Sequence, residues 1–209
     1  MSYLWAKSAP SRMEILFASA NRNKLFEARK IFGPDFTLLL PADLGFTGDI
    51  PETHDTLAGN SAQKAQFVWD LFGKPCFSDD TGLEVDALGG APGVYSARYA
   101  GEPFNAARNI EKLLRELGDT PYEARTARFR CVVSYIDPTG TLTQFEGRCE
   151  GHINFAPTRS DAFGYDPVFI PEGLDVTMAE IPVEVKNGLS HRGKAMDQLV
   201  CHLKQNLAR

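Results

Sequence analysis

The sequence predicts a single α/β domain with a mixed sheet. In the first half of the chain, short apolar runs that end at polar residues alternate with stretches of helical period, as expected for strands separated by helices. Residues 126–149 instead contain two strand-like runs around a turn, which adds an antiparallel hairpin. The chain has 209 residues without an internal repeat or a low-complexity linker, so we expect one domain over residues 13–209.

The first half of the chain begins with a buried strand, expected over residues 14–19. A helix is expected over 23–32, where apolar residues share one face and a Gly-Pro pair follows. A second helix, over 55–73, ends at a glycine, and a second buried strand follows over 75–78. The buried face of this second helix is expected to consist of Leu57, Ala62, Ala65, Trp69 and Phe72.

The second half continues with a helix over residues 105–117, whose leucine and isoleucine stripe ends at a glycine. The turn of the predicted hairpin falls at 138–141, in the sequence Pro-Thr-Gly-Thr. A further short strand is expected over 166–171. The last helix begins near Ser190 and carries apolar residues at every fourth position.

Composition and charge exclude several classes of protein. A hydrophobic content of 43% and a charged content of 23% are typical of a globular protein. The net charge of −5, without a lysine or arginine block, argues against a nucleic acid polymer as partner but leaves a small anionic ligand open. The apolar runs are far shorter than the roughly 18 residues that a membrane span needs, so we expect no membrane partner.

Terminal and cysteine patterns indicate where the protein works. Residues 1–12 lack the apolar core of a standard secretory signal, and we expect them to form a disordered extension. The cysteines at positions 76, 131, 149 and 201 form no CxxC pair, which supports neither a zinc site nor a disulfide framework. The sequence therefore predicts a cytoplasmic protein whose reduced thiols lie mostly in the core.

The first candidate site is the loop between the first strand and the first helix. Backbone N–H groups at a helix N-terminus favour anions, and Lys24 adds a full positive charge there. The loop does not match the Walker A pattern. The alternative is a polar loop in which Asn21 or Asn23 caps the helix and Lys24 is solvated. The candidate phosphate-binding residues are Ser19, Ala20, Asn21, Arg22, Asn23 and Lys24.

The second candidate is an acidic group. Asp79 and Asp80 follow a predicted buried strand, and because adjacent carboxylates repel, we expect a positive charge beside them. Glu52 precedes a helix, and together with Asp80 it would supply the two hard oxygen ligands that Mg²⁺ takes. Alternatively, the two aspartates form an Asx turn before Gly82. For Glu52 the alternative is a carboxylate near a helix start, where the helix dipole favours a negative charge.

The third candidate lies near the C-terminus. In the sequence FGYDP (163–167), Phe163 or Tyr165 is able to stack on a base, or both rings fill the core. Lys186, His191 and Arg192 place hydrogen-bond donors around the start of the last helix. Alternatively, Ser190 simply caps that helix and its basic neighbours are solvated. Taken together, the candidate groups suit one ligand that contains a triphosphate, a metal ion and a base.

Three motifs carry a resemblance to a known family. In the stretch SDDTGLEVDALGGAPGVYSARYAG (78–101), in FGYDPVF (163–169) and in SHR (190–192), the chain resembles the inosine-triphosphate pyrophosphatase family, and its bacterial branch in particular. The resemblance runs from about Met13 to the C-terminus. It implies a long mixed sheet with two lobes, a central cleft and a homodimer. It also implies Mg²⁺-dependent hydrolysis of ITP, XTP, dITP and dXTP to the monophosphate and pyrophosphate, which keeps these nucleotides out of DNA and RNA.

The resemblance also assigns roles to residues. Ser19 to Lys24 matches the phosphate-contacting loop, and Glu52 and Asp80 match the metal ligands. Asp80 also matches the catalytic proton acceptor, and Thr81 matches a residue that touches substrate. The remaining substrate contacts would be Phe163, Gly164, Tyr165, Asp166, Lys186, His191 and Arg192. The chain departs from the family at Ala20 and Asn23, at His54, where glycine is common, and at 158–162, where relatives are rich in glycine.

The resemblance leads to a mechanism and leaves two alternatives. We expect Mg²⁺ beside Asp80 to offset the charge of Asp79, and donors from His191 or Arg192 to face O6 of the base, which opposes the amino group of adenine. A nucleotide sensor without turnover is one alternative, although both metal acids and both lysines are present. A septum-formation-type nucleotide pyrophosphatase is the other, although the FGYDP and SHR motifs argue against it.

Overall fold

The helices of the chain begin and end where the sequence provides caps. The Thr56 side chain accepts a hydrogen bond from the Gly59 N–H at 3.0 Å and opens helix α2, and Asn105 caps α3 in the same way through the Arg108 N–H. At the other end of α2, Gly73 has a φ of 58° and donates its N–H to the Trp69 carbonyl. The predicted starts and ends of these two helices are therefore confirmed to within two residues.

The computed structural model describes residues 12–158 and 162–207, so the predicted N-terminal extension lies outside it except for Arg12. The strands are β1 (Met13–Phe17), β2 (Phe36–Leu39), β3 (Cys76–Val85), β4 (Pro92–Gly93), β5 (Thr126–Ile136), β6 (Leu142–Ile153) and β7 (Phe169–Pro171). The α-helices are α1 (Arg22–Phe32), α2 (Leu57–Phe72), α3 (Ala106–Leu117), α4 (Val183–Leu189) and α5 (His191–Leu207).

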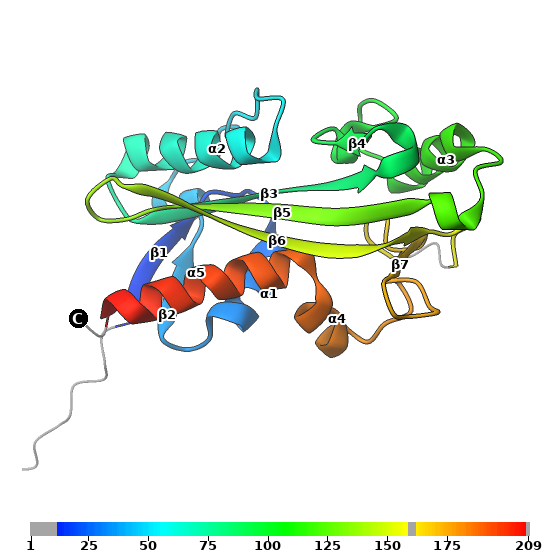
Figure 1. Ribbon diagram of the computed structural model, residues 1–209. Helices are drawn as coiled ribbons and strands as arrows, with labels where there is room; N and C mark the ends of the chain where they lie inside the picture. Colours follow the sequence, from blue (N-terminus) through cyan, green and yellow to red (C-terminus); the bar gives the residue numbers. More distant parts are fainter. Residues whose placement is uncertain (1–11, 159–161, 208–209) are drawn as a thin grey trace, which may run out of the picture.

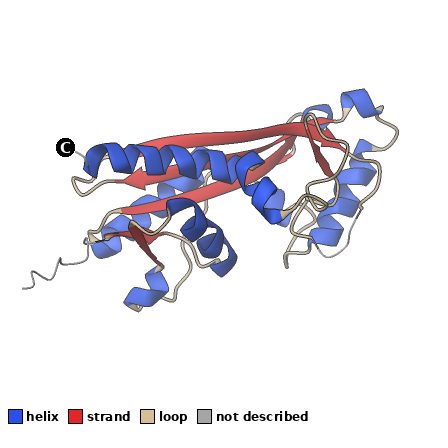
Figure 2. Ribbon diagram, turned by 90° about the horizontal axis from the view of Figure 1, so that it is seen from below, coloured by secondary structure: helices blue, strands red, loops and turns tan. Residues whose placement is uncertain are grey.

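All seven strands join one mixed sheet in the order β2-β1-β3-β5-β6-β7, with β4 beside β3. β1 runs parallel to β2 and β3, whereas β3, β5, β6 and β7 alternate in direction. Helix α2 covers one side of the sheet, and α1 and α5 cover the other (Figure 1). Seen from below, α5 runs along the long strands (Figure 2).

One edge of β3 is interrupted. β1 pairs with Cys76 and Phe77, and β4 pairs with Leu83 and Glu84 on the same edge. Between them, residues 78–82 have no strand neighbour on that edge among the described strands. We call this stretch the edge gap. The other edge of β3 pairs with β5 along its whole length, so the gap does not break the sheet.

Two hydrophobic cores lie at the two ends of the long strands. One end buries Phe17, Phe77 and Leu199 against α1 and α5, with a smaller cluster beneath α2. The other end buries Leu113 and Phe169 beneath α3 and the last loops. The polar residues of the edge gap belong to neither core. The predicted single α/β domain with a mixed sheet and two lobes is confirmed, and a cleft between the lobes stays a prediction.

Three predicted details are wrong. The strand expected over 75–78 continues to Val85, because β5 pairs with each of its residues. The strand expected over 166–171 begins only at Phe169, since the Val168 N–H bonds back to the Tyr165 carbonyl in a turn. The buried face expected for α2 is wrong in part: Leu57 and Ala65 are buried, but Ala62, Trp69 and Phe72 are only half-buried, and the face also includes Asn60, Ser61, Lys64 and Val68.

Other features agree with the sequence. The hairpin of β5 and β6 turns at residues 137–141, and the four cysteines are free, with Cys201 exposed and the other three buried. Burial raises the pKa of the Cys76 and Cys131 thiols to about 12. Within the described residues, no helix has the length and apolar character needed to cross a membrane.

Candidate active site

The centre of the candidate site is the acidic pair on β3. Successive side chains of a strand point to opposite faces, so Asp79 points toward α1 and α5, whereas Asp80 points toward α2. The ion pairs agree with this alternation: Asp79 binds Lys24 of α1 and Arg192 of α5, and Asp80 binds Lys64 of α2. The two carboxylates therefore belong to two different charge clusters.

Asp79 is the more enclosed of the two acids, with 1% of its side chain exposed. Lys24 Nζ lies 3.0 Å from Asp79 and Arg192 Nε lies 3.1 Å from it. Burial opposes ionisation, but the two cations outweigh it and lower the pKa of Asp79 well below its usual range. The charge of Asp79, expected to be offset by a metal ion, is instead offset by two cations of the chain.

Asp80 has one cationic partner, which it shares. Lys64 Nζ lies 3.2 Å from Asp80 Oδ1 and 2.5 Å from Glu52 Oε1. Burial, together with the nearby Glu52 charge, raises the pKa of Asp80, although Lys64 acts in the opposite direction. The pKa of Lys64 is raised despite its burial, because three carboxylates surround it. The lysine is therefore a fixed positive charge between the two acids.

The Glu52–Asp80 pair fits a divalent cation. Asp80 Oδ2 is buried and lacks a hydrogen-bond partner within the described part of the chain, and both carboxylates already converge on one positive charge. Hard carboxylate oxygens suit Mg²⁺, which usually takes one or two of them beside phosphates and water. Among the described residues, no group of three or more His, Cys, Asp or Glu side chains that could hold a metal ion occurs, so the fit depends on these two acids.

Lys64 was not found by the sequence analysis. A lysine inside a helix is usually solvated, but Lys64 is buried on α2. The available signal was its spacing: Leu57, Ser61, Lys64 and Val68 follow one another at intervals of three and four residues, which places the lysine on the buried face. A charged residue on such a face requires a partner, and the acids of β3 provide it.

The loop from Ser19 to Lys24 is held by its own side chains. Ser19 Oγ accepts from the Asn21 N–H at 3.1 Å, and Asn21 Oδ1 accepts from the Lys24 N–H at 3.2 Å, so Asn21 caps α1. The side chain of Asn23 lies outside the described residues. Lys24 is not solvated as the alternative reading expected, because its ammonium pairs with Asp79.

A cavity of about 470 Å³ opens beside this loop, which is within the usual size range of ligand pockets. It combines cationic, polar and apolar side chains from α1 and from the segment after β2. The lining residues are Ser19, Ala20, Arg22, Leu25, Phe26, Arg29, Leu40, Pro41, Ala42, Asp43, Phe46, Thr47, Gly48 and Ile50. Three residues of the predicted phosphate loop, Ser19, Ala20 and Arg22, thus line this cavity, together with Arg29 of α1.

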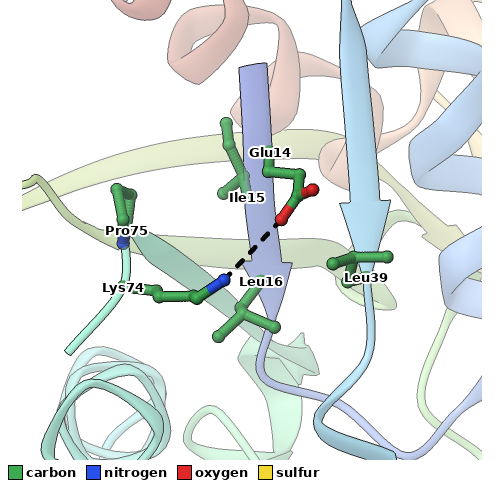
Figure 3. A pocket seen from close by; sticks show the side chains of 6 residues that line it. All are labelled: Glu14, Ile15, Leu16, Leu39, Lys74 and Pro75. Carbon is green, nitrogen blue, oxygen red and sulfur yellow. Dashed lines mark ion pairs between the residues drawn. The ribbon is translucent and has the colours of Figure 1, made fainter. Parts of the chain in front are cut away.

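A second hollow, of about 180 Å³, lies toward the other end of β1. Figure 3 shows its lining residues, among which Glu14 and Lys74 form an exposed ion pair at 3.8 Å. Exposed pairs of this kind contribute little to stability or binding. None of the predicted site residues lines this hollow, so we assign it no chemistry.

The C-terminal candidates separate into different environments. Phe163 is 60% exposed, whereas Tyr165 is buried in the second core and donates its hydroxyl to the Ser96 carbonyl at 2.9 Å. Gly164 between them has a φ of 57°, a backbone conformation that favours glycine. Tyr165 therefore fills the core, as one of the two readings expected, whereas the exposed Phe163 ring does not, and stacking of Phe163 on a base stays a prediction. Residues 159–161 of the segment that departs from the family lie outside the described residues.

Asp166 and Lys186 form an ion pair next to this loop, with the ammonium donating to Asp166 Oδ2. Burial raises the pKa of Asp166, and Lys186 acts against this shift. The Glu27 and Arg192 charges also act on Asp166. The pair therefore belongs electrostatically to the same side of the molecule as Asp79.

The start of α5 places His191 and Arg192. Ser190 caps the helix by accepting from the Gly193 N–H at 2.9 Å, which confirms that part of the alternative reading. The helix approaches β6 at Gly147, where an added Cβ would lie 2.1 Å from the His191 carbonyl oxygen, so a side chain there would push α5 away. Arg192, expected as a donor for a base, is held by Asp79 and by Glu27 at 2.6 Å.

His191 is not a solvated cation. Its ring stacks on Phe129 with the centroids 4.9 Å apart, and Nδ1 is buried without a hydrogen-bond partner in the described residues. Burial, and then the neighbouring Arg192, lowers the pKa of His191 well below its usual value. Thr81, the next residue of β3 on the side of Asp79, lies opposite Cys131 of β5.

The sequence is similar to that of known proteins over most of its length. The profile of the Ham1 family matches residues 15–202. The chain belongs to the Ham1 family. The dITP/XTP pyrophosphatase of Porphyromonas gingivalis is 50% identical over 186 residues, which cover 89% of this chain and 95% of that protein. The dITP/XTP pyrophosphatase of Flavobacterium johnsoniae is 46% identical over 188 residues, 90% and 96% of the two chains.

Solved structures of Ham1 proteins have the same fold. The Ham1 protein of Staphylococcus aureus matches with a TM-score of 0.85 and 39% identity, covering 92% of this chain and 99% of that one. A Ham1 protein from Coxiella burnetii matches with a TM-score of 0.84 and 34% identity, with the same coverage. The resemblance seen in the sequence motifs is therefore confirmed over nearly the whole chain.

Proposed function

We propose that this Ham1 protein hydrolyses deaminated purine nucleoside triphosphates, namely ITP, XTP, dITP and dXTP, to the nucleoside monophosphate and pyrophosphate. Two relatives that are at least 46% identical to it carry the name dITP/XTP pyrophosphatase. The observation that carries the proposal is the convergence of Glu52 and Asp80 on Lys64, next to a second cluster built on Asp79. Removal of deaminated nucleotides would keep them out of DNA and RNA.

Glu52 and Asp80 would hold Mg²⁺ through their carboxylate oxygens. When bound, the ion supplies Lewis-acid stabilisation of the phosphate charge and of the pyrophosphate leaving group. Lys64 lies between the same two acids, so it places a second positive charge at this point. The described residues therefore provide the acidic ligands and a lysine in one place.

Asp80 is the residue that we assign to the attacking water. Its free Oδ2 is buried, which leaves an acceptor available to orient a water molecule toward the α-phosphorus or to take its proton. Burial keeps the pKa of this carboxyl above its usual value, a shift in the direction expected of a general base.

The phosphate groups would be bound by the loop from Ser19 to Lys24 and by Lys186. Lys24 is fixed by Asp79, so its charge is held in place before the substrate arrives. The cavity of about 470 Å³ beside the loop adds Arg22 and Arg29 on its walls. Thr81 lies on the same strand and would contribute a hydroxyl group.

The base would lie on the side of Phe163. The exposed ring is available to stack on any purine, whereas Asp166, His191 and Arg192 would contact polar atoms of the base or sugar. Donors that face O6 favour hypoxanthine and xanthine, because adenine has an amino group at position 6. Arg192 is oriented by two carboxylates, which makes it the donor we expect to discriminate most.

We further propose that the enzyme works as a cytoplasmic homodimer, as the resemblance to its family implies. Its substrates would be free nucleotides, not nucleic acid polymers or membrane lipids. The acidic net charge of −5 agrees with this choice of substrate.

The test is a panel of nucleoside triphosphates with Mg²⁺, in which the monophosphate and pyrophosphate are both quantified. We expect ITP, XTP and dITP to be hydrolysed far faster than ATP, with one pyrophosphate released per monophosphate. Orthophosphate and a nucleoside diphosphate as the main products would contradict attack at the α-phosphorus. Nucleotide binding without turnover would favour a sensor.

A further inference from the structure

Glu52 lies in a segment without regular secondary structure. No helix or strand covers the described residues between Leu44 and Leu57, and the Glu52 side chain is 40% exposed. A carboxylate on such a segment loses conformational freedom when it holds a ligand, which weakens binding unless the segment is already fixed. The position of Glu52 relative to Asp80 therefore depends on what anchors residues 51–56.

Two side chains of α2 bind the backbone directly after Glu52. Gln63 Oε1 accepts from the Thr53 N–H at 2.8 Å, and Gln63 Nε2 donates to Thr53 Oγ1 at 2.9 Å. Asn60 Oδ1 accepts from the His54 N–H at 2.8 Å. Two consecutive peptide N–H groups are thus bonded to the same helix, which fixes both the position and the direction of the segment.

The helix surface is shaped for this contact. A Cβ added at Gly59 would lie 2.8 Å from the His54 Cβ and 2.9 Å from Thr56 Oγ1, so glycine allows the segment to lie against the first turn of α2. Asn60 is only 2% exposed. Buried polar side chains are normally hydrogen-bonded, and the Asn60 amide oxygen meets this requirement by accepting from the His54 N–H. The histidine that departs from the family pattern is accommodated by this glycine.

Asn60, Gln63 and Lys64 lie at positions i, i+3 and i+4 of α2 and form one surface patch. Lys64 on this patch binds both Glu52 and Asp80. One rigid helix therefore contacts the two candidate metal ligands: Asp80 through the lysine, and Glu52 through the lysine and through the two amide side chains.

We infer that Asn60 and Gln63 are positioning residues that hold Glu52 at the distance from Asp80 that a divalent cation requires. The inference rests on the proposed metal role of the two acids. Neither amide touches the substrate or the ion; each acts through the backbone of Thr53 or His54. Residues that orient a metal ligand in this way commonly change metal affinity by about 10- to 100-fold when they are removed.

The experiment compares Gln63→Ala with Gln66→Ala. Gln66 lies on the same helix but is exposed and donates to Asp70 at 2.8 Å, so it controls for the loss of a glutamine from α2. Mn²⁺ binding to the protein is titrated by electron paramagnetic resonance, and the Mg²⁺ concentration for half-maximal hydrolysis of ITP is measured separately. We expect Gln63→Ala to weaken Mn²⁺ binding at least 10-fold and Gln66→Ala to leave it unchanged.

Two further variants sharpen the test. Gln63→Glu keeps the acceptor for the Thr53 N–H and should recover most of the Mn²⁺ affinity. Asn60→Ala should weaken binding in the same direction as Gln63→Ala. Because Asn60 is buried, this variant is judged only if it folds, and the half-buried Gln63 site carries the test without it.

Equal Mn²⁺ affinities in Gln63→Ala and Gln66→Ala would overturn the inference, as would wild-type protein that does not bind Mn²⁺. Failure of the proposed function is a separate result. If the wild type binds Mn²⁺ and Gln63→Ala weakens this binding but no pyrophosphate is released from any nucleotide, the positioning role stands and the hydrolase assignment fails.

Discussion

Asp79 and Asp80 are adjacent in the chain, yet they lie in two regions with different electrostatics. On the side of α1 and α5, Asp79 is fully enclosed and binds two cations, which hold its pKa low. On the side of α2, Asp80 shares one lysine with Glu52, has a raised pKa and has an oxygen without a hydrogen-bond partner among the described residues. The residue type is the same, so the surroundings alone separate the two acids.

The difference indicates that Asp79 has a structural role and Asp80 a functional one. A buried carboxylate with two cations is fully compensated and acts as an anchor that orients its partners. A carboxylate whose negative charge is only partly neutralised, and which has an oxygen without a partner, is able to accept a metal ion or a proton. We therefore expect substitutions at Asp79 to affect mainly stability, and substitutions at Asp80 to affect mainly turnover.

The largest expected effect is that of Asp79→Asn on stability. The substitution removes the shared partner of Lys24 and Arg192, and breaking a buried pair costs about 3–5 kcal/mol. We expect about 3 kcal/mol, because Arg192 keeps Glu27 and Lys24 is able to turn toward water. Urea denaturation gives the free energy of unfolding. A loss below about 1 kcal/mol would show that Asp79 is not an anchor.

Asp80→Asn should give the opposite result. We expect kcat for ITP to fall about 100-fold or more, equivalent to about 2.7 kcal/mol of transition-state stabilisation. The free energy of unfolding should stay within about 1 kcal/mol of the wild-type value, because folding already disfavours the charged form of Asp80. Pyrophosphate release and urea denaturation are measured on the same preparations. Unchanged turnover in folded Asp80→Asn would remove the distinction between the two acids.

A smaller effect concerns pH on the side of Asp79. The pKa of His191 lies well below its usual value of about 6.5 in the folded protein. As the pH falls below 6.5, the His191 side chain becomes protonated in the unfolded chain but stays neutral in the folded protein. Stability should therefore decrease, with a slope of at most about 1.4 kcal/mol per pH unit from this group.

The measurement is the free energy of unfolding between pH 7.5 and 5, for the wild type and for His191→Phe. The phenylalanine keeps an aromatic ring against Phe129 but carries no proton, so it should flatten the slope. An unchanged slope, or a His191 ring that titrates near pH 6.5 by NMR, would contradict a neutral imidazole in the folded protein.

Local features of the fold were predictable from the sequence. The α2 and α3 ends, the hairpin turn at 138–141 and the apolar face of α5 follow from caps, glycines and spacing. The course of β3 through Asp79 and Asp80 was not predictable in this way, because two adjacent carboxylates are typical of a turn. Pairing with β5, about 50 residues later in the chain, overrides that preference.

Sequence motifs identified most residues of the candidate site, but they did not show which of these residues form ion pairs. The sequence identified both aspartates and Lys24, but it did not show that Lys24 and Arg192 meet at Asp79, since these residues are 55 and 113 positions away from it. The spacing of Lys64 from Leu57 and Val68 was a signal of burial, but it did not show that the partners of the lysine are carboxylates, which lie near it only in space. Long-range ion pairs of this kind leave no local pattern.

The edge gap in β3 also affects whether a strand of another polypeptide is able to pair with this sheet. A strand edge without a neighbour is a template on which another polypeptide is able to add, and this is a common route to aggregation. Here the open stretch covers only residues 78–82, is closed at both ends by β1 and β4, and carries two aspartates. An incoming strand would have to fit between β1 and β4 and lie beside two charged side chains. The short length of the opening and its two charged side chains thus discourage association with another strand.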